Sequence, residues 1–479
     1  MIKSSIFKSY DIRGIYPDQL NEATAYEVGR GFVKHTGAKK IVVGHDARNS
    51  SPELFRALSE GLISQGANVT SIGQAPTECV YFALGNYPEF DAGIMITASH
   101  NPKEYNGFKM IIKENGVIQM VRGKDMLSTI ESFGVHSTSS GQAAQDRQSG
   151  YLEVAHGKMQ EKDIWRDYVD YILKFSGDIH PVKSAGGGVP PKAGQFDRVK
   201  PFKIVIDASN GVIGKAINLL KEKLPVEVIP LNFEPDGNFP NHSPNPLEPG
   251  SSDQIKQAIK ENQADFGFIF DGDADRVFLV DEHGKLVSAD TTLLLLAKYF
   301  IIKNPGSVVA YNAICSKSVP EFVTKWGGVP LRTPVGFVNV REGLMKNKGI
   351  MGGELSGHYC FRDYFYMDSG IMAFLTLLQV ISEDGRKISE MVKELSPYFK
   401  SAELNFEIEN KEAVMEKIKV KYADGKQDFL DGVTVEYQDW WFNVRPSNTE
   451  PLLRLTVEAD KEDLLKSKKE ELSEFINKN

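Results

Sequence analysis

A serine and a histidine directly follow an apolar run in GIMITASHNPKEYNGFKM, residues 93–110. Ser99 and His100 come just after the run at 94–96, which reads as the end of a buried strand, and Lys109 lies further along the segment. A serine at a strand end can carry a transferred group if a metal and a base are near it. Lys109 can be that base if burial or neighbouring cations lower its pKa. No G-x-S-x-G elbow surrounds Ser99, so a hydrolase site is not indicated, and a turn or helix cap is the alternative.

A run of carboxylates lies in FIFDGDADRVFLV, residues 268–280. Asp271, Asp273 and Asp275 alternate with other residues, so an extended backbone places the three side chains on one face. Close carboxylates repel one another unless a cation neutralises them. All-oxygen ligation suits Mg²⁺ or Ca²⁺ better than zinc. An acidic turn paired with Arg276 is the alternative, but the apolar flanks favour a metal site.

Two further segments carry hydrogen-bonding groups without a pattern that decides their use. In GGELSGHYCF, residues 352–361, the glycines permit a tight turn and the polar side chains can hold hydroxyl groups. The residues concerned are Glu354, Ser356 and His358. In FKSYDIRGIYP, residues 7–17, Tyr10 and Arg13 precede a glycine. Taken alone, the first segment is compatible with a simple turn, and Arg13 with a surface or structural charge.

A donor-rich turn lies near the C-terminus, in FNVRPSNTEPLLRL, residues 442–455. It contains Arg445, Ser447, Asn448 and Thr449 between two prolines. An arginine fork beside hydroxyl and backbone N–H donors is a phosphate-binding arrangement. An ordinary turn remains the alternative from these residues alone.

The elements that must position these loops form a weak internal repeat. Three segments each consist of a β-branched strand, a polar turn and a run with helical periodicity: 39–58, 202–220 and 306–323. A second strand follows in each, at 67–73, 226–231 and 328–336, and then a third, at 91–100, 264–273 and 348–358. These units predict three similar mixed-sheet α/β domains. Because ligands bind at the carboxyl ends of strands in open sheets, the loops after the third strands are expected to converge on one cleft.

The region 399–479 has a different order of strand, helix, strands and helix, which predicts a small α+β domain. The expected domain limits are 1–158, 159–285, 286–398 and 399–479. The stretches at 136–150 and 184–194, rich in small polar residues or in glycine and proline, are expected to be exposed connections.

Composition excludes some classes of protein. The net charge of −8 argues against a nucleic-acid binder, although a local cationic pocket for an anionic small molecule is compatible with it. The three cysteines, Cys79, Cys315 and Cys360, are far apart and read as reduced buried thiols, which fits a cytoplasmic protein. The start of the chain has no apolar run of signal-peptide length, and no run is long enough to span a membrane, so no membrane association is expected.

Six motifs together resemble the α-D-phosphohexomutase family, which includes phosphomannomutase and phosphoglucomutase. They occur in family order and span nearly the whole chain: YDIRG (10–14), TASHNP (97–102), NGFK (106–109), DGDADR (271–276), GELSGH (353–358) and RPSNTEP (445–451). The resemblance implies four domains around a central cleft. It implies that Ser99 carries a phosphoryl group, and that Asp271, Asp273 and Asp275 hold Mg²⁺ against an oxygen of that phosphoserine.

The reaction implied by the resemblance interconverts hexose 1-phosphate and hexose 6-phosphate, with mannose or glucose as the sugar. It proceeds through glucose 1,6-bisphosphate or mannose 1,6-bisphosphate, which also serves as activator. Lys109 and Arg13 are implied as general acid/base or as stabilisers of the reacting hydroxyl, with His100 and Arg276 nearby. The implied substrate-binding residues are Tyr10, Glu354, Ser356, His358, Arg445, Ser447, Asn448 and Thr449. The expected partners are sugar phosphates only, and the expected assembly is a monomer or a weak homo-oligomer.

The sequence departs from the family pattern at two places in the third domain. Phe337 stands where members that use both mannose and glucose often have histidine, so sugar preference is left open. Ile314 stands near the position of a phosphate-contacting lysine, for which Lys317 is a possible substitute. Two other functions are kept as alternatives: a phosphatase with Asp271 as nucleophile, and a sugar-phosphate sensor without turnover.

Overall fold

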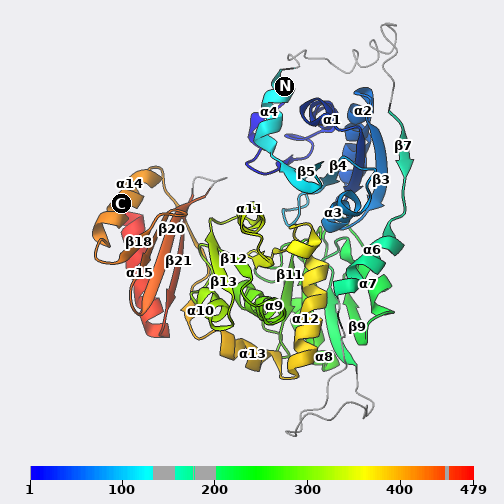
Figure 1. Cartoon of the computed structure of the whole chain (residues 1–479). Coiled ribbons are helices and arrows are strands. Elements are labelled where there is room, and N and C mark those ends of the chain that lie inside the picture. Colours follow the sequence, from blue (N-terminus) through cyan, green and yellow to red (C-terminus); the bar gives the residue numbers. More distant parts are fainter. Residues whose placement is uncertain (1, 133–156, 176, 178–200, 448–451, 479) are drawn as a thin grey trace.

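The computed structural model describes residues 2–132, 157–175, 177, 201–447 and 452–478. The expected connections at 136–150 and 184–194 lie outside the described residues. The described residues form four sheets with helices against them, arranged in chain order (Figure 1). The predicted α/β fold with a C-terminal α+β domain is confirmed.

The first sheet has seven strands in the order β1-β5-β4-β2-β3-β7, with β6 paired to β5. Its strands are β1 (Ile12–Ile15), β2 (Lys40–His45), β3 (Asn68–Gln74), β4 (Ala92–Ile96), β5 (Tyr105–Glu114), β6 (Val117–Val121) and β7 (Met159–Glu161). Its helices are η1 (Ser4–Ile6), α1 (Glu22–Thr36), α2 (Ser51–Ser64), α3 (Thr77–Asn86) and α4 (Gly123–Glu131). α1 begins where the Asn21 side chain accepts a hydrogen bond from the Thr24 N–H, and ends at Gly37 in the left-handed region.

The second and third sheets repeat the centre of the first. The second runs β11-β10-β8-β9 and the third β13-β12-β14-β15. Their strands are β8 (Phe202–Asp207), β9 (Val226–Leu231), β10 (Phe266–Phe270), β11 (Val277–Val280), β12 (Val308–Asn312), β13 (Val329–Thr333), β14 (Met351–Gly353) and β15 (Tyr359–Phe361). Their helices are α6 (Trp165–Ile172), η2 (Leu173–Phe175), α7 (Ile213–Lys221), α8 (Asp253–Asn262), α9 (Ala289–Lys303), α10 (Ser318–Lys325), α11 (Phe337–Asn347), η3 (Arg362–Tyr364), α12 (Gly370–Asp384) and α13 (Ile388–Leu395).

In each of these three sheets the first strand of the repeat lies between the second and third, and all three strands are parallel. The third strand then pairs with an antiparallel strand that returns from the polar loop: β4 with β5, β10 with β11, and β14 with β15. The loops predicted to carry the chemistry are therefore the hairpin connections of the three sheets.

The fourth domain contains β16 (Phe399–Lys400), β17 (Leu404–Glu407), α14 (Lys411–Lys421), β18 (Lys426–Asp428), β19 (Val433–Glu436), β20 (Trp440–Pro446), β21 (Leu452–Ala459) and α15 (Glu462–Lys478). Its sheet has the order β16-β21-β20-β19-β18, with β17 also paired to β21. The limits at 158, 285 and 398 stay predictions, and β7, just past the first of them, pairs with β3 of the first sheet.

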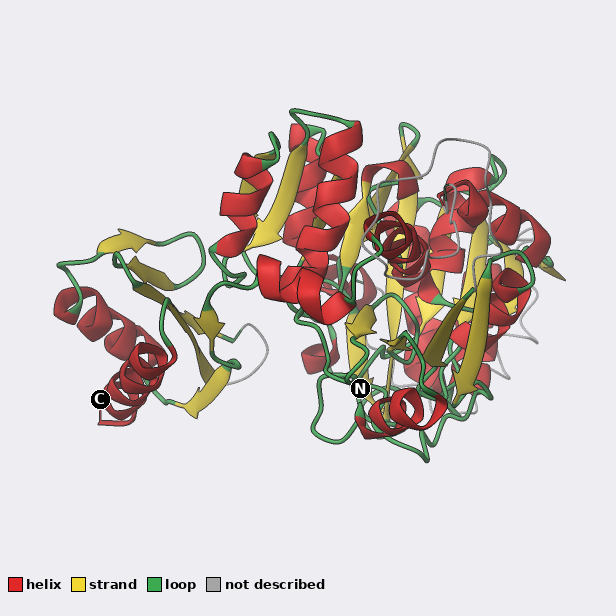
Figure 2. Cartoon of the chain, turned by 90° about the horizontal axis from the view of Figure 1, so that it is seen from below, coloured by secondary structure: helices red, strands yellow, loops and turns green. Residues whose placement is uncertain are grey.

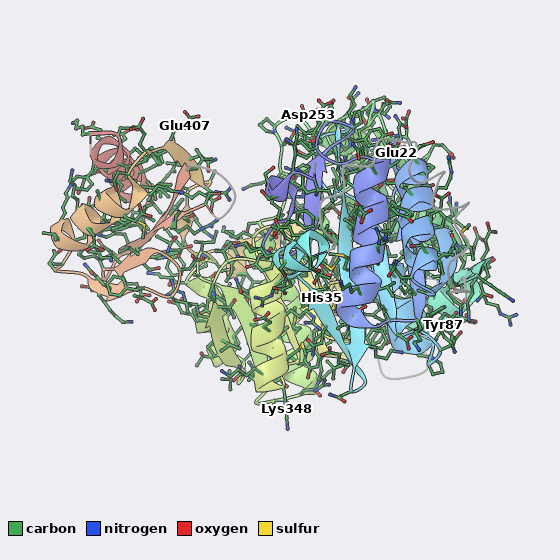
Figure 3. The ribbon with its side chains drawn as sticks, turned by 90° about the horizontal axis from the view of Figure 1, so that it is seen from above. Glu22, His35, Tyr87, Asp253, Lys348 and Glu407 are labelled. Carbon is green, nitrogen blue, oxygen red and sulfur yellow. The ribbon has the colours of Figure 1, made fainter. Side chains whose placement is uncertain are left out.

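The fourth domain adjoins the third and lies at one end of the molecule (Figures 1 and 2). The view from above also places Glu407, in the fourth domain, far from Glu22 at the start of α1 (Figure 3). One large apolar cluster contains α3 of the first domain together with strands and helices of the second and third, whereas the fourth domain has its own cluster. The first three domains are thus joined through a common core.

Two expectations from composition can be compared with this fold. Cys79, Cys315 and Cys360 are buried and free, as predicted. Among the described residues, no helix has both the length and the apolar character needed to cross a membrane.

Candidate active site

Ser99 lies in the loop that follows β4, where its backbone adopts a φ of +50°, unusual for a residue other than glycine. Its side chain is buried and Oγ donates a hydrogen bond to Oδ2 of Asp271 over 2.8 Å. The Ser99 carbonyl oxygen lies against Gly272, where a Cβ atom would come within 2.9 Å of it. Glycine at 272 therefore lets the serine loop and the carboxylate loop touch.

A buried arginine that sequence reasoning missed holds this loop in place. The Arg48 guanidinium donates to the carbonyl oxygens of Ser99, Asn101, Pro102 and Tyr105, at 2.6 to 2.9 Å. Four carbonyl contacts from one rigid fork fix the course of the loop.

Asp46 completes this support. Its carboxylate pairs with Arg48 over 3.1 Å and accepts a hydrogen bond from the Thr97 hydroxyl, which in turn accepts one from the Ser99 N–H. The signal in the sequence was the HDAR turn after β2, which reads only as a polar turn without the structure.

The three aspartates lie together in the loop between β10 and β11, as predicted. Asp271, Asp273 and Asp275 are fully buried, and each offers an oxygen within 4.8 Å of the others. The Thr77 hydroxyl donates to Asp273 Oδ2 over 2.6 Å, so the start of α3 supports the loop. Burial, followed by the charges of the other two aspartates, raises the pKa of Asp271 well above its ordinary value.

This group fits a divalent cation by its own chemistry. Oδ1 of Asp273 is buried and accepts no hydrogen bond from any described residue. Oδ1 of Asp275 accepts none either, although His358 Nε2 lies 3.4 Å from it. A buried carboxylate oxygen without a hydrogen bond is costly, and a hard cation with oxygen ligands would satisfy it. With Ser99 Oγ already at Asp271, a cation held here would lie beside the serine.

Lys109, on β5, provides positive charge to the same group. Its ammonium pairs with Asp273 Oδ2 over 2.7 Å and also donates to Asp275. Burial opposes the charged form, but the two carboxylates outweigh it and the pKa of Lys109 is raised. The sequence analysis made Lys109 a base on the condition that its pKa is lowered, and this arrangement does not meet that condition. The ammonium is a counter-ion of Asp273 and Asp275.

The third loop brings Glu354, Ser356 and His358 into one hydrogen-bonded cluster. The Glu354 carboxylate accepts hydrogen bonds from the Ser356 hydroxyl and, over 3.0 Å, from the Gly336 N–H. His358 Nδ1 lies 3.2 Å from the same carboxylate. Burial acts against this carboxylate, but the hydrogen bond and charge of His358 outweigh it and lower the pKa of Glu354 to about 2.

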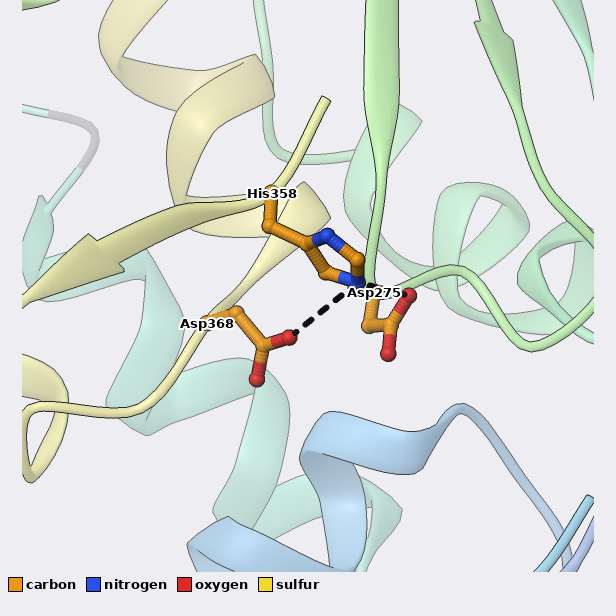
Figure 4. A group of neighbouring side chains, drawn as sticks. All are labelled: Asp275, His358 and Asp368. Carbon is orange, nitrogen blue, oxygen red and sulfur yellow. Dashed lines mark ion pairs between the residues drawn. The ribbon is translucent and has the colours of Figure 1, made fainter. Parts of the chain in front are cut away.

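His358 also connects the third loop to the carboxylate loop that contains Asp275 (Figure 4). Its Nε2 lies 3.4 Å from Asp275 and 3.7 Å from Asp368. Burial and the charge of Arg276 lower the pKa of His358, but Asp275 and Glu354 outweigh them and raise it to about 9. Arg276 Nε lies 3.2 Å from the same nitrogen of His358. Asp275 and Asp368 therefore already have positive charge beside them, and these side chains form an ion-pair network.

Arg13 and His100, which the family resemblance suggested for catalysis, lie around the serine loop. Arg13, on β1, donates to the Asn101 side chain over 2.7 Å and pairs with Asp11. His100 Nδ1 lies 3.4 Å from Ser99 Oγ, and burial, with Arg276 and Arg13 nearby, holds the pKa of His100 well below its ordinary value.

Tyr10 comes close to the third domain rather than to the serine. Its hydroxyl lies 3.4 Å from the Asn339 side-chain nitrogen, near Gly336. Arg445 lies on β20 and pairs with Glu403 over 2.7 Å, and the Ser447 N–H donates to the Leu452 carbonyl. Asn448 and Thr449 lie outside the described residues.

Comparisons with known proteins identify the family of this chain. The four domain models described as phosphoglucomutase/phosphomannomutase, alpha/beta/alpha domains I, II and III and C-terminal domain, match residues 4–131, 191–284, 288–399 and 403–475. The chain belongs to the phosphoglucomutase/phosphomannomutase family.

Full-length relatives support the assignment. A phosphomannomutase of Vibrio cholerae is 35% identical over 494 aligned positions, covering 100% of this chain and 99% of the relative. The phosphohexose mutases of Xanthomonas campestris are 34% identical over 476 residues, with 98% of each chain covered. A crystal structure of a phosphoglucomutase/phosphomannomutase family protein from Burkholderia thailandensis matches with a TM-score of 0.81 at 31% identity, covering 99% and 98% of the two chains. The chain is accordingly an enzyme of the mutase type.

Two family departures can now be located in this mutase. The Phe337 ring stacks on the His358 ring, with centroids 5.1 Å apart. Lys317 pairs with Asp460 of the fourth domain over 2.8 Å, and Ile314 is buried. Lys317 therefore forms a contact between the third and fourth domains. This contact does not support the suggestion that Lys317 substitutes for the lysine expected near Ile314.

Proposed function

We propose that this mutase interconverts hexose 1-phosphate and hexose 6-phosphate, with mannose or glucose as the sugar, through a phosphoserine at Ser99. The observation that carries the proposal is the contact of Ser99 Oγ with Asp271, 2.8 Å apart, inside a buried group of three carboxylates. A serine in that place can exchange a phosphoryl group whose charge is neutralised locally.

In the first transfer, a bond forms between the phosphorus on Ser99 and the 6-oxygen of hexose 1-phosphate, and the bond from phosphorus to Ser99 Oγ breaks. The proton lost by the 6-hydroxyl balances the proton gained by Ser99 Oγ, so no net proton is consumed. Lys109 and Arg13, with His100 and Arg276 nearby, would serve as general acid/base or would stabilise the negative charge that develops on the reacting hydroxyl.

The product of this transfer is a hexose 1,6-bisphosphate, which must turn before the second transfer. The phosphoryl group at position 1 then passes to Ser99 Oγ, and hexose 6-phosphate is released. Glucose 1,6-bisphosphate or mannose 1,6-bisphosphate added from solution would load an unphosphorylated Ser99 in the same way.

Roles for the binding residues follow from their hydrogen-bonding groups. Glu354, Ser356 and His358 would hold ring hydroxyls, with Tyr10 nearby. The turn of Arg445, Ser447, Asn448 and Thr449 would hold the phosphate that is not reacting, whichever end of the sugar it occupies.

Asp271, Asp273 and Asp275, together with an oxygen on Ser99, would hold Mg²⁺. Bound Mg²⁺ supplies Lewis-acid neutralisation of phosphoryl oxygens. Lys109 supplies a second positive charge on the side of Asp273 and Asp275.

The test is phosphorus NMR of the purified protein with Mg²⁺ and a trace of glucose 1,6-bisphosphate, using mannose 1-phosphate, glucose 1-phosphate or glucosamine 1-phosphate as substrate. We expect the 1-phosphate signal to convert to a 6-phosphate signal, and a Ser99→Ala variant to show no conversion. Inorganic phosphate growing equally in both proteins would instead indicate the phosphatase with Asp271 as nucleophile. Binding of substrate without any conversion in the wild type would indicate the sensor.

A further inference from the structure

A long loop of the second domain, to which no role has been given above, contacts the first domain next to the serine loop. Residues 232–252 connect β9 to α8 through turns and bends, and the structure describes the whole of this segment. Loops of more than about 15 residues without a helix or strand of their own are uncommon in compact domains and usually serve a function. We call this segment the strap.

The strap is fixed to the second domain by Asn210, in the turn after β8. The Asn210 side chain donates a hydrogen bond to the Glu234 carbonyl over 3.0 Å and accepts one from the Asn241 side chain over 2.9 Å. The same turn contacts the carboxylate loop, because the Val212 N–H donates to the Gly272 carbonyl over 3.3 Å. The strap and the carboxylate loop are therefore held by one turn.

The strap reaches the first domain at the turn that contains Arg48. The Asn49 side-chain amide donates to the side-chain oxygen of Asn238 over 3.0 Å. A Cβ atom on Gly237 would lie 2.4 Å from the Asn49 nitrogen and 2.6 Å from the Ala47 carbonyl oxygen, so glycine permits this approach of the two backbones. The strap thus touches the chain on both sides of Arg48.

The Phe239 side chain of the strap contacts the Arg48 guanidinium itself. All five N–H donors of the guanidinium are used in its plane, one on Asp46 and four on carbonyl oxygens of the serine loop. Its faces remain for packing, and Arg48 Cζ lies over the Phe239 ring, 5.3 Å from the ring centroid. Phe239 has a φ of +48°, which is unfavourable for a bulky residue and persists only where the surroundings impose it.

We propose that Phe239 is a positioning residue for phosphoryl transfer: it holds Arg48, and through Arg48 the serine loop, against the carboxylate loop. Ser99 and Asp271 belong to different domains, so their contact depends on how the two loops are held together. A Cβ atom on Gly272 would lie 3.6 Å from Phe239 Cε1, so the ring lies where the loops touch. Phosphoryl transfer tolerates little displacement of the reacting atoms. The inference rests on the proposed function in that Ser99 is the residue phosphorylated.

The first test is hydrogen–deuterium exchange of the full-length protein, followed by mass spectrometry in peptides that cover residues 97–106. The Ser99 N–H donates to the Thr97 hydroxyl, and the Thr97 N–H to the Gly107 carbonyl, so exchange here reports how firmly the serine loop is held. Phe239→Leu keeps an apolar side chain but removes the ring. It should raise the exchange rate of these peptides by about tenfold.

Phe202→Leu is the matched control. Phe202 is also a buried phenylalanine of the second domain, 7% exposed against 8% for Phe239, and its ring packs on Phe266 within the sheet. This variant should melt at a lower temperature but leave the exchange of residues 97–106 unchanged. Wild-type exchange in Phe239→Leu, or equally faster exchange in both variants, would overturn the proposal.

Gly237→Ala tests the strap without altering Phe239. Its Cβ would push the strap away from the Arg48 turn, so exchange of residues 97–106 should rise here as well. Gly29→Ala is its control, because a Cβ there would lie 2.4 Å from the Leu58 carbonyl oxygen, between α1 and α2 of the first domain. Both glycine variants should lose stability, but only Gly237→Ala should loosen the serine loop. Equal exchange in the two would overturn the role of the strap even if Phe239→Leu does not fold.

Kinetics show whether Phe239 acts through Arg48. Phe239→Leu should slow the phosphorylation of Ser99 by glucose 1,6-bisphosphate and lower kcat by about tenfold, with KM changed by less than about twofold. The double variant Phe239→Leu/Arg48→Lys should be phosphorylated no more slowly than Arg48→Lys, because both substitutions remove the same support. Additive slowing would show that Phe239 does not act through Arg48. A wild type that is not phosphorylated would refute the proposed function alone, since the exchange measurement uses no bisphosphate.

Discussion

Asp273 accepts hydrogen bonds from two residues of the first domain. Its Oδ2 accepts from the Thr77 hydroxyl and the Lys109 ammonium, while Oδ1 has no described partner. We expect Asp273→Asn to weaken Mg²⁺ binding and to lower turnover by at least about 100-fold, because one of three charged ligand groups becomes neutral. The fold should persist, since the amide oxygen can still accept from Thr77. The measurement is turnover as a function of Mg²⁺ concentration, with thermal melting alongside.

Asp207→Asn is a suitable control for that substitution. Asp207 is also fully buried in the second domain, at the end of β8, where it contacts Ser209 N–H and His242. It should lose stability without any change in the Mg²⁺ concentration that gives half-maximal turnover. Near-normal activity of Asp273→Asn at low Mg²⁺ would contradict the metal assignment.

At the scale of single residues, the sequence indicated the groups but not their charge states. Ser99 and the three aspartates were singled out as candidates from their loops, because the types of side chain at a strand end are local features, and the family resemblance suggested their roles. The raised pKa of Lys109 was not predictable, since it depends on Asp273 and Asp275, which only the folded chain brings to β5.

At the scale of elements, the repeat predicted from the sequence has a structural counterpart in the turn after the first strand. Asp46, Asp207 and Asn312 each accept a hydrogen bond from the N–H two residues further on, at 3.0, 2.9 and 3.3 Å. This Asx turn ends the strand in the same way in all three domains. The order of strand, turn and helix was therefore readable from the sequence. The antiparallel return strands were not assigned, because each pairs with its neighbour only after a polar loop has turned, and β11 and β15 have only four and three residues.

The first of these turns, which begins at Asp46, also supports the serine loop, because it contains Arg48. Arg48→Lys keeps a positive charge but cannot reach four carbonyl groups at once. We expect turnover and the rate of phosphorylation of Ser99 by glucose 1,6-bisphosphate to fall by about 10- to 100-fold with little change in KM, since a small displacement of the serine is enough. Mass spectrometry of the protein after timed incubation with the bisphosphate measures the loading.

Arg341→Lys separates the loop effect from the cost of altering a buried arginine. Arg341 is equally buried, and donates to the Ile118 carbonyl away from the serine loop. Both variants should melt at lower temperature, but only Arg48→Lys should load slowly. Equal loading rates in the two variants would show that Arg48 contributes stability alone.

At the scale of the whole molecule, α3 joins the first domain to the third. The Glu78 carboxylate on α3 accepts from the Ser369 hydroxyl and from the Ile371 N–H, and its carbonyl accepts from the Tyr364 hydroxyl. Glu78 is fully buried, and burial is the main reason that its pKa rises from the ordinary 4.5 to about 8. The sequence could not indicate this joint, because the apolar pattern of α3 does not say which domains cover it.

The last prediction concerns the pH dependence of this joint. Between about pH 4.5 and 8 the unfolded chain ionises Glu78 while the folded protein keeps the proton, so the free energy of unfolding falls by about 1.4 kcal/mol per pH unit from this group, and the fall stops above about pH 8. Glu78→Gln removes this pH-dependent contribution to the free energy of unfolding, because glutamine does not ionise. Glutamine still has an oxygen that can accept the hydrogen bond from the Ile371 N–H. The Tm of the variant relative to the wild type should therefore rise as pH increases from 5 to 8. The measurement is differential scanning calorimetry of both proteins at each pH. The fourth domain has its own core, so its transition should not respond to the substitution and serves as an internal control. A Tm difference that stays constant across this pH range would refute the buried, protonated state of Glu78.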